Sequence, residues 1–157
     1  MLNEDYKDML RVLSEEGVKF LLIGAYAMAV HGYPRATMDM DIWIMPSPKN
    51  AEAVFRAFHR FGAPLNNLTK DDLQEDDVVF QIGIAPRRID IMTSASGLQF
   101  EDVYLKAMTV NIAGIDVRVP RIEDLIANKR AVGRTKDLAD AEALEAIVNS
   151  GSETESS

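Results

Sequence analysis

Two aspartates separated by one residue are the first feature of this chain whose spacing could do chemistry. Asp39 and Asp41 stand in residues 38–45, where apolar residues alternate with these acids and with Trp43, as in a strand with unequal faces. Because successive strand side chains point to opposite faces, the two carboxylates share a face, about 6–7 Å apart. Aspartate is depleted in strands, and like charges at this range repel, so the pair requires solvent or cations. Carboxylate-rich sites suit Mg²⁺ or Mn²⁺.

A third carboxylate, Asp90, stands between two isoleucines in a second strand-like stretch, residues 88–92. If this strand lies beside residues 38–45, the three acids converge. Three carboxylates could hold two Mg²⁺ ions about 3.5–4 Å apart, the arrangement that serves in-line phosphoryl transfer. The spacing alone equally allows Asp39 and Asp41 to line a solvated sheet face, with Asp90 an unrelated surface acid.

A glycine stands at the expected start of a helix, upstream of the acidic strand. Gly24 follows a short apolar run, residues 18–23, and precedes the small apolar residues 25–30. Free backbone N–H groups at such a turn, together with the positive end of the helix, can bind phosphate. A tight turn alone explains a single glycine, whereas its combination with two acidic strands favours a phosphate site.

Composition limits the other kinds of chemistry. The chain has 157 residues, no cysteine and two histidines, which excludes cysteine nucleophiles, cysteine-ligated zinc and iron–sulfur clusters. Lys plus Arg is 17 and Asp plus Glu is 25, for a net charge of −8. This excess of acid argues against broad binding to nucleic acids or anionic membranes. The most apolar window, residues 20–30, is too short to cross a bilayer, so we expect a cytoplasmic protein.

Periodicity and turn signals predict one mixed α/β or α+β domain over residues 1–149, with a disordered tail over 150–157. The expected architecture is a mixed β-sheet flanked by helices, two of which end the chain. The predicted helices span residues 3–16, 25–30, 48–61, 100–107, 121–132 and 135–148. The predicted strands span residues 18–23, 38–45, 78–84, 88–92, 110–112 and 115–119.

The order of glycine turn, short helix, Asp-x-Asp strand and later Asp strand resembles the DNA polymerase beta-like nucleotidyltransferase superfamily. The likeness is greatest to its small stand-alone prokaryotic members. It is carried by residues 23–44, 88–93 and 123–140, so that it covers about residues 20–142. The resemblance implies the nucleotidyltransferase fold and the transfer of a nucleoside monophosphate from an NTP to a hydroxyl acceptor, with release of pyrophosphate.

The resemblance also implies roles for individual residues. Asp39 and Asp41 would bind two Mg²⁺ ions, and Asp90 would complete the metal site and help to deprotonate the acceptor. Gly24 and the backbone N–H of Ala25 would hold the nucleotide's phosphates. The superfamily often has Ser or Gly where this chain has Ala25. Alanine keeps the backbone N–H but lacks the hydroxyl contact that a serine would make. The alternative is therefore a weakly active or inactive protein that binds or regulates a partner, as in toxin–antitoxin pairs.

Three further residues could support nucleotide binding. Arg35 could contact a triphosphate bidentately, or merely pair with Asp39 or Asp41. Thr37 could orient Asp39 or a phosphate. Lys129, in the middle of a predicted helix, could neutralise a phosphate or lie on a solvated helix face.

Other polar and aromatic residues have ordinary structural explanations. For His31 the sequence favours a helix-end role, and Trp43 could wall the site, stack on a base or pack in the core. Salt bridging between the last two helices is favoured over chemistry for the charged residues Arg134, Lys136, Asp137 and Asp140.

The expected partners follow from the charge and the resemblance. We expect an NTP as substrate and a protein or small molecule as acceptor, and neither an extended nucleic acid nor a membrane. A chain this short leaves little room for a separate acceptor-binding domain, so a homodimer or a partner protein could complete the cleft.

Overall fold

The chain forms a mixed sheet with helices on both sides. The computed structural model describes residues 2–35, 39–84 and 87–156. The helices are α1 (Glu4–Glu15), α2 (Gly24–Val30), α3 (Pro48–Phe61), the 3₁₀ turn η1 (Asp72–Gln74), α4 (Phe100–Lys106), α5 (Ile122–Val132) and α6 (Thr135–Ser156). The strands are β1 (Phe20–Ile23), β2 (Met40–Ile44), β3 (Val79–Ile82), β4 (Ile89–Met92), β5 (Met108–Ile112) and β6 (Ile115–Val119). The predicted elements are present, with ends that differ by a few residues except at the end of α6, which continues beyond its predicted end.

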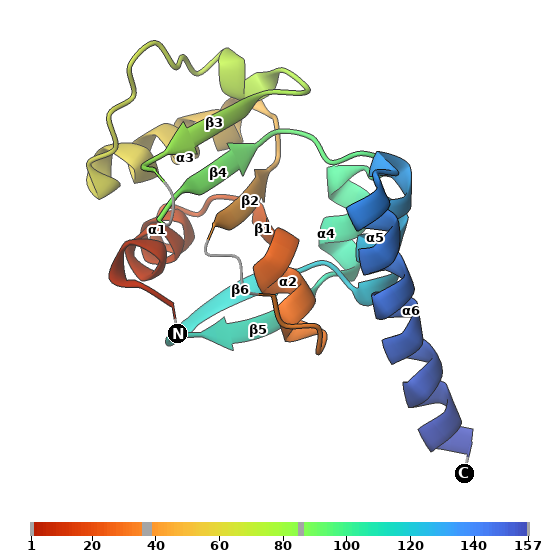
Figure 1. The fold of residues 1–157 in the computed structure, drawn as a ribbon. Coiled ribbons are helices and arrows are strands. Elements are labelled where there is room, and N and C mark those ends of the chain that lie inside the picture. Colours follow the sequence, from red (N-terminus) through yellow and green to blue (C-terminus); the bar gives the residue numbers. More distant parts are fainter. Residues whose placement is uncertain (1, 36–38, 85–86, 157) are drawn as a thin grey trace.

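Four strands form the main sheet, in the order β1-β2-β4-β3 (Figure 1). β2 and β4 are parallel neighbours, whereas β1 pairs with β2, and β3 with β4, in antiparallel fashion. β5 and β6 form a separate antiparallel hairpin. The sheet is therefore mixed, as predicted, and its central pair is the two strands that carry aspartates.

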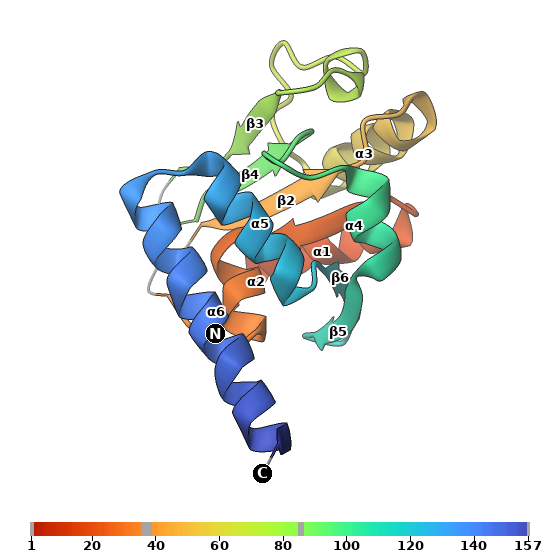
Figure 2. The ribbon, with the colours of Figure 1, turned by 90° about the vertical axis from the view of Figure 1, so that its right-hand side faces the viewer.

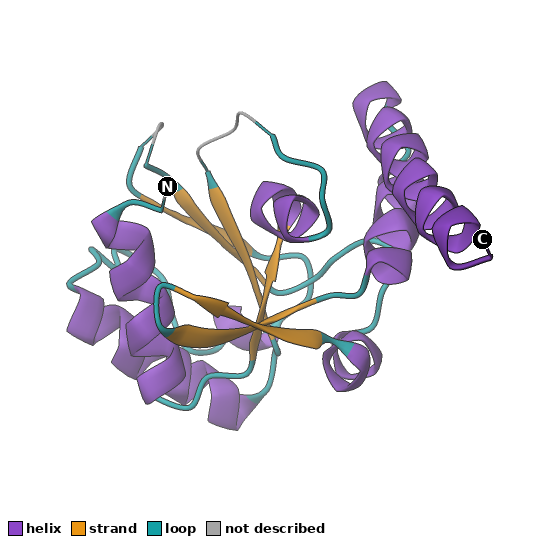
Figure 3. Cartoon of the chain, turned by 90° about the horizontal axis from the view of Figure 1, so that it is seen from below, coloured by secondary structure: helices purple, strands orange, loops and turns teal. Residues whose placement is uncertain are grey.

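The alternation of side chains along β2 divides the molecule into two layers. Met40, Ile42 and Ile44 are fully buried in the main core, together with residues of α1 and α3. The opposite face carries Asp41 and Trp43, and there Trp43 packs with residues of β1 and α4 in a second, smaller core. α4 and α5 lie across this second face (Figure 2). The strands therefore lie between these two helices and the helices of the main core, α1 and α3 (Figure 3).

Local signals fix several helix ends. The Ser47 side chain accepts a hydrogen bond from the backbone N–H of Asn50, and Pro48 occupies the first turn of α3. Gly133, in the left-handed conformation, ends α5 and separates it from α6.

The structure differs from the prediction at the C-terminus. The polar composition of residues 150–157 predicts disorder, whereas helix α6 continues to Ser156. The end of α6 extends away from the body of the molecule (Figure 1). Extending an existing helix by one residue forms one more backbone hydrogen bond and avoids the cost of starting a new helix. Amino-acid composition alone does not include this gain. Of the helices in the described ranges, none combines the length and apolar character needed to span a membrane.

Candidate active site

The sheet register places two of the three predicted carboxylates directly opposite each other. Asp41 on β2 pairs with Asp90 on the parallel strand β4, and Asp39 lies one residue before β2. Asp90 is only 9% exposed, and Asp41 is partly buried. The condition set by the sequence, that residues 88–92 lie beside the Asp-x-Asp strand, is met, and the three acids are neighbours.

An arginine that the sequence interpretation missed lies among these acids. Arg88 Nη2 is 3.0 Å from Asp39 Oδ2, and Arg88 Nε is 2.9 Å from Asp90 Oδ1. Arg88 Nη2 also donates a hydrogen bond to Asp90 Oδ2 at 3.2 Å. Nε and Oδ1 are buried and face each other at an angle unsuited to a hydrogen bond, so their contact is an ion pair only. Arg88 stands two residues before Asp90, and this spacing in a strand could have revealed it.

The surroundings of Asp41 disfavour its ionised form. Burial raises its pKa to about 6, and the nearby charges of Asp90 and Asp39 add to the rise, while Arg88 and Lys129 oppose it. Three carboxylates and one guanidinium leave this acid group at −3 + 1 = −2. A further cation would favour the ionised form of Asp41.

Gly24 is required by the position of Asp41. It has a φ of +69°, and a Cβ at this position would lie 2.2 Å from Asp41 Oδ2. The strand register explains the contact, because Ile23 on β1 pairs with Asp41 on β2. The carboxylate thus lies against the turn between β1 and α2. Any side chain at position 24 would displace it.

The chemistry of these donors fits Mg²⁺ or Mn²⁺, which prefer carboxylate oxygens. Asp90 Oδ1 is buried without a hydrogen bond, and burial together with the charges of Asp90 and Asp39 raises the pKa of Asp41, so a bound cation would stabilise its ionised form. Within the described ranges, however, no three acidic or histidine side chains surround a common point as metal ligands do. We attribute this to Arg88, which lies between Asp39 and Asp90.

A cleft opens beside the acids. Its volume is about 280 Å³, and its lining includes Gly24 and Asp41 on one side and Lys129 and Arg134 on the other. The end of β4 and the segment after it also contribute to the lining, through Met92, Ser94, Ala95 and Ser96. Asn128 on α5 donates a hydrogen bond to the Ser96 carbonyl oxygen at 3.0 Å, which fixes this segment to the helix. The cleft therefore lies between Asp41 of the acid group on one wall and the cations Lys129 and Arg134 on the other.

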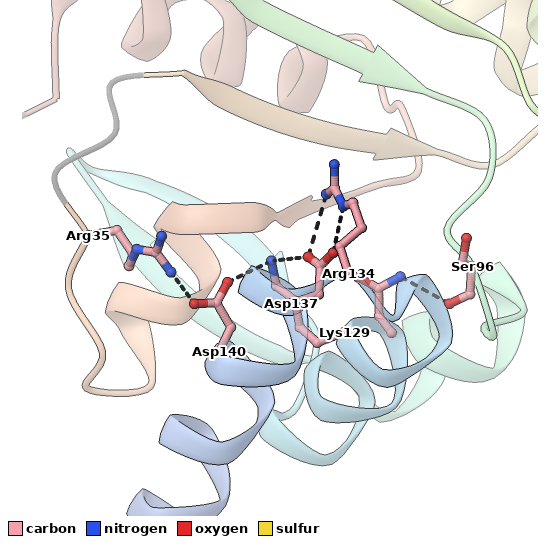
Figure 4. Close-up of polar contacts among 7 residues, drawn as sticks. Arg35, Ser96, Lys129, Arg134, Asp137 and Asp140 are labelled. Atoms are coloured by element: carbon pink, nitrogen blue, oxygen red, sulfur yellow. Dashed lines mark hydrogen bonds and ion pairs between the residues drawn. The ribbon is translucent and has the colours of Figure 1, made fainter.

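The cationic wall is an ion-pair cluster at the junction of α5 and α6 (Figure 4). Lys129 Nζ lies 3.1 Å from Asp140 Oδ2 and 3.4 Å from Asp137 Oδ1. Arg134 Nε donates to Asp137 Oδ2 at 2.7 Å, and Arg35 pairs with Asp140. These five residues are called the α5–α6 cluster below. The hydrogen bond from Arg134 is the main cause of a lowered pKa of Asp137.

This cluster answers several questions that the sequence left open. Arg35 pairs with Asp140, not with Asp39 or Asp41 as its simple alternative supposed. Lys129 is neither solvated nor free, because two acids hold it beside the cleft. Salt bridges do join the last two helices, as predicted.

The other residues singled out by the sequence have structural surroundings. His31 Nε2 lies 2.7 Å from the Pro120 carbonyl oxygen, in keeping with a helix-end role. Trp43 is 1% exposed and meets Phe100 edge to face, so it packs in the core and presents no open face to a base. Ala25 lies in the first turn of α2. Thr37 lies outside the described residues.

Comparisons with known proteins give the same fold and a family. Residues 2–155 match a sequence family described as "Nucleotidyl transferase of unknown function (DUF2204)". The chain belongs to this family. A crystal structure from Thermotoga maritima, of the "putative nucleotidyltransferase (TM1012)", is similar with a TM-score of 0.59. The two chains are 17% identical, and the similarity covers 96% of each. A search of the curated proteins finds no match.

These findings confirm the predicted fold and the resemblance. The neighbour at 17% identity shows the nucleotidyltransferase fold alone, and the family match extends over nearly the whole chain. Family and fold together support nucleotidyl transfer as the general function.

Proposed function

We propose that the protein is a metal-dependent nucleotidyltransferase, which moves a nucleoside monophosphate from an NTP to a hydroxyl acceptor and releases pyrophosphate. The observation that carries this proposal is the pairing of Asp41 with Asp90 on adjacent parallel strands, with Asp39 beside them and the Gly24 turn against Asp41. An acid group of −2 beside a cleft with cations on its far wall suits a substrate that combines phosphates with divalent metal.

Asp39, Asp41 and Asp90 would hold two Mg²⁺ ions, with Mn²⁺ as an alternative. When bound, these ions lower the pKa of the acceptor hydroxyl and offset the charge of the leaving group. Loading requires Arg88 to withdraw from between Asp39 and Asp90, because its guanidinium lies among the same oxygens.

The chain's own residues would bind the nucleotide and move the proton. The backbone N–H groups of Gly24 and Ala25 would hold the phosphates, with Lys129 on the far wall of the cleft. The segment before β2 would supply two more contacts to the nucleotide, from Arg35 and Thr37. The acceptor oxygen attacks the α-phosphorus of the NTP. The bond from that phosphorus to the oxygen shared with the β-phosphorus breaks, and pyrophosphate leaves.

One carboxylate would take the proton that the acceptor hydroxyl loses. Asp90 is the residue that we assign to this role in addition to metal binding, because it lies opposite Asp41 at the same site. Burial, together with the charges of Asp90 and Asp39, raises the pKa of the neighbouring Asp41 to about 6, so a carboxylate at this position holds a proton more readily than a free one.

The acceptor that we propose is a protein side chain or a small molecule. The net charge of −8 disfavours an extended nucleic acid and a membrane surface. A homodimer or a partner protein would complete the cleft, in the cytoplasm. Light scattering of the purified protein checks the homodimer: a mass near 17 kDa at all concentrations would contradict it.

A second candidate function is a binding or regulatory protein of the toxin–antitoxin type, with weak or no turnover. Two observations favour it: Arg88 lies between Asp39 and Asp90, and Ala25 stands where the superfamily often has Ser or Gly. This candidate binds a partner protein without label transfer.

Label transfer separates the two candidates. The protein is incubated with α-³²P-labelled NTPs, Mg²⁺ and a cell lysate, beside the variants Asp41→Asn and Asp90→Asn. Asp71→Asn is the matched control, because Asp71 is an exposed acid before η1. Metal-dependent labelling by the wild type and by Asp71→Asn supports the enzyme. No labelling, together with no nucleotide binding by calorimetry, rejects it.

A further inference from the structure

The α5–α6 cluster contains more cations than a salt bridge between two helices requires. It holds three cations, Arg35, Lys129 and Arg134, around two acids that are almost completely buried. Asp137 and Asp140 are 1% and 3% exposed. Building on the function proposed above, we propose that this cluster is the subsite for the pyrophosphate end of the NTP. Arg134 and Lys129 contact the phosphates, and Asp137 and Asp140 are positioning residues that hold these cations at the cleft.

The cations of the cluster retain donors for an anion. The Lys129 ammonium has three N–H donors, and its contacts are with one oxygen of each acid. Arg134 uses Nε and Nη2 toward Asp137, which leaves the Nη1 donors without a contact among the described residues. The Arg134 side chain is 66% exposed and lines the cleft, so it is accessible to a ligand. The cluster carries a net charge of 3 − 2 = +1, which attracts an anion.

The two buried acids determine where the cations lie. Asp137 contacts both Lys129 and Arg134, so one carboxylate sets the separation of the two cleft-lining cations. Asp140 contacts Lys129 and also Arg35, which precedes the acidic strand by a few residues. Groups held in place before the ligand arrives lose little entropy on binding, and this is how a positioning residue raises affinity.

A second ion pair between the same helices provides a comparison. Arg130 pairs with Glu145, and both side chains are well exposed. Neither residue lines the cleft. This pair joins α5 to α6 without facing the site, so it offers a control that loses a helix-to-helix ion pair and nothing else.

The proposal makes a prediction whose sign is opposite to that of simple electrostatics. Asp137→Asn raises the cluster's charge from +1 to +2, so an effect of charge alone would tighten anion binding. If Asp137 positions the cations, the same substitution weakens binding, because Lys129 and Arg134 lose their common partner.

Calorimetric titration with inorganic pyrophosphate in Mg²⁺ buffer tests this. We expect Arg134→Gln to weaken pyrophosphate binding about tenfold and Asp137→Asn several-fold, with Glu145→Gln unchanged. In turnover, Arg134→Gln raises the KM for NTP more than it lowers kcat. If Asp137→Asn does not fold, Arg134→Gln carries the test alone, since that side chain is mostly exposed.

Three outcomes overturn the proposal: no pyrophosphate binding by the wild type, equal binding by Arg134→Gln, or equal or tighter binding by a folded Asp137→Asn. If the wild type still transfers label in those cases, the subsite assignment fails and the proposed function stands. If the wild type neither binds nucleotide nor transfers label, the proposed function fails and the subsite with it.

Discussion

Two groups of aspartates differ in their surroundings, and each reaches the cleft through one member, Asp41 on the sheet and Asp137 on α6. The acid group on the sheet, Asp39, Asp41 and Asp90, has Arg88 as its cationic partner, and the pKa of Asp41 rises to about 6. In the α5–α6 cluster, two acids share three cations, and the pKa of Asp137 falls, chiefly because Arg134 donates a hydrogen bond to it.

The difference separates residues that need a ligand from residues that hold others in place. A carboxylate whose ionised form is disfavoured by burial and by like charges gains when it binds a cation, whereas a carboxylate already paired with cations gains little more and acts as a fixed support. The same residue type thus indicates a metal-binding role on the sheet and a positioning role on the helices. The predictions below test each side of this comparison, beginning with the largest effect.

Gly24→Ala tests the close contact between the Asp41 carboxylate and the backbone at the start of α2. The new Cβ would clash with Asp41 Oδ2 at 2.2 Å and sit at a positive φ, so we expect a loss of about 3 kcal/mol in the free energy of unfolding. Gly17→Ala is the matched control: its φ is +73°, but nothing lies within 4 Å of its Cβ. It should cost about 1 kcal/mol. Equal losses in urea denaturation would show that Asp41 does not press on Gly24.

Asp41→Asn tests the cost of an ionised carboxylate at this buried position beside two other acids. A pKa raised from 3.8 to about 6 means that the folded protein holds the proton more tightly than the unfolded chain. The ionised carboxylate therefore destabilises the fold fully above pH 6, and this cost disappears as the pH falls toward 4. We expect Asp41→Asn to stabilise the protein by about 2 kcal/mol at pH 8, allowing for partial exposure, and little at pH 4. A pH-independent difference in urea denaturation would argue against this account.

Asp137→Asn should show the opposite sign. Because the pKa of Asp137 is lowered in the fold, its stabilising contribution is present above the unfolded pKa and is lost as the pH falls through the folded value. We expect a loss of about 1.5 kcal/mol at pH 7, which shrinks below pH 4. Glu145→Gln, in the exposed α5–α6 pair, should change stability by less than about 0.5 kcal/mol. Stabilisation at pH 7 would contradict the comparison.

Arg88→Gln changes the charge of the acid group from −2 to −3. With the guanidinium removed from between Asp39 and Asp90, Mn²⁺ should bind about fivefold more tightly in calorimetry, a shift of about 1 kcal/mol. Arg87→Gln, at the neighbouring exposed position, is the control. Weaker Mn²⁺ binding by Arg88→Gln alone would mean that the arginine orients the metal ligands instead of competing with the ions.

Local patterns predicted most of the fold and the central acids. Period-2 alternation identified β2 and β4 and placed Asp39 and Asp41 on one face, but the convergence of Asp90 depended on the two strands being neighbours, which the spacing alone left open. Gly24 was predicted as a turn, but its close contact with Asp41 depends on the β1–β2 register, which a single strand does not reveal.

Long-range pairs were the part that the sequence did not determine. Arg35 pairs with Asp140, 105 residues away, although two acids stand much nearer to it in the chain. Arg88 stands two residues from Asp90, but its second partner, Asp39, comes near it only when β2 and β4 pair. The attraction between two charges depends on their distance in space and not on their separation along the chain. The packing of the fold therefore determines which partner a charged side chain meets.

The most direct test of the central claim is Mg²⁺-dependent transfer of label from an α-³²P-NTP, measured for the wild type, Asp41→Asn, Asp90→Asn and Asp71→Asn. We predict labelling by the wild type and by Asp71→Asn, its loss with EDTA, and a decrease of at least about 100-fold in both site variants. Labelling that persists in Asp41→Asn and Asp90→Asn, or that does not require a metal, would contradict the account.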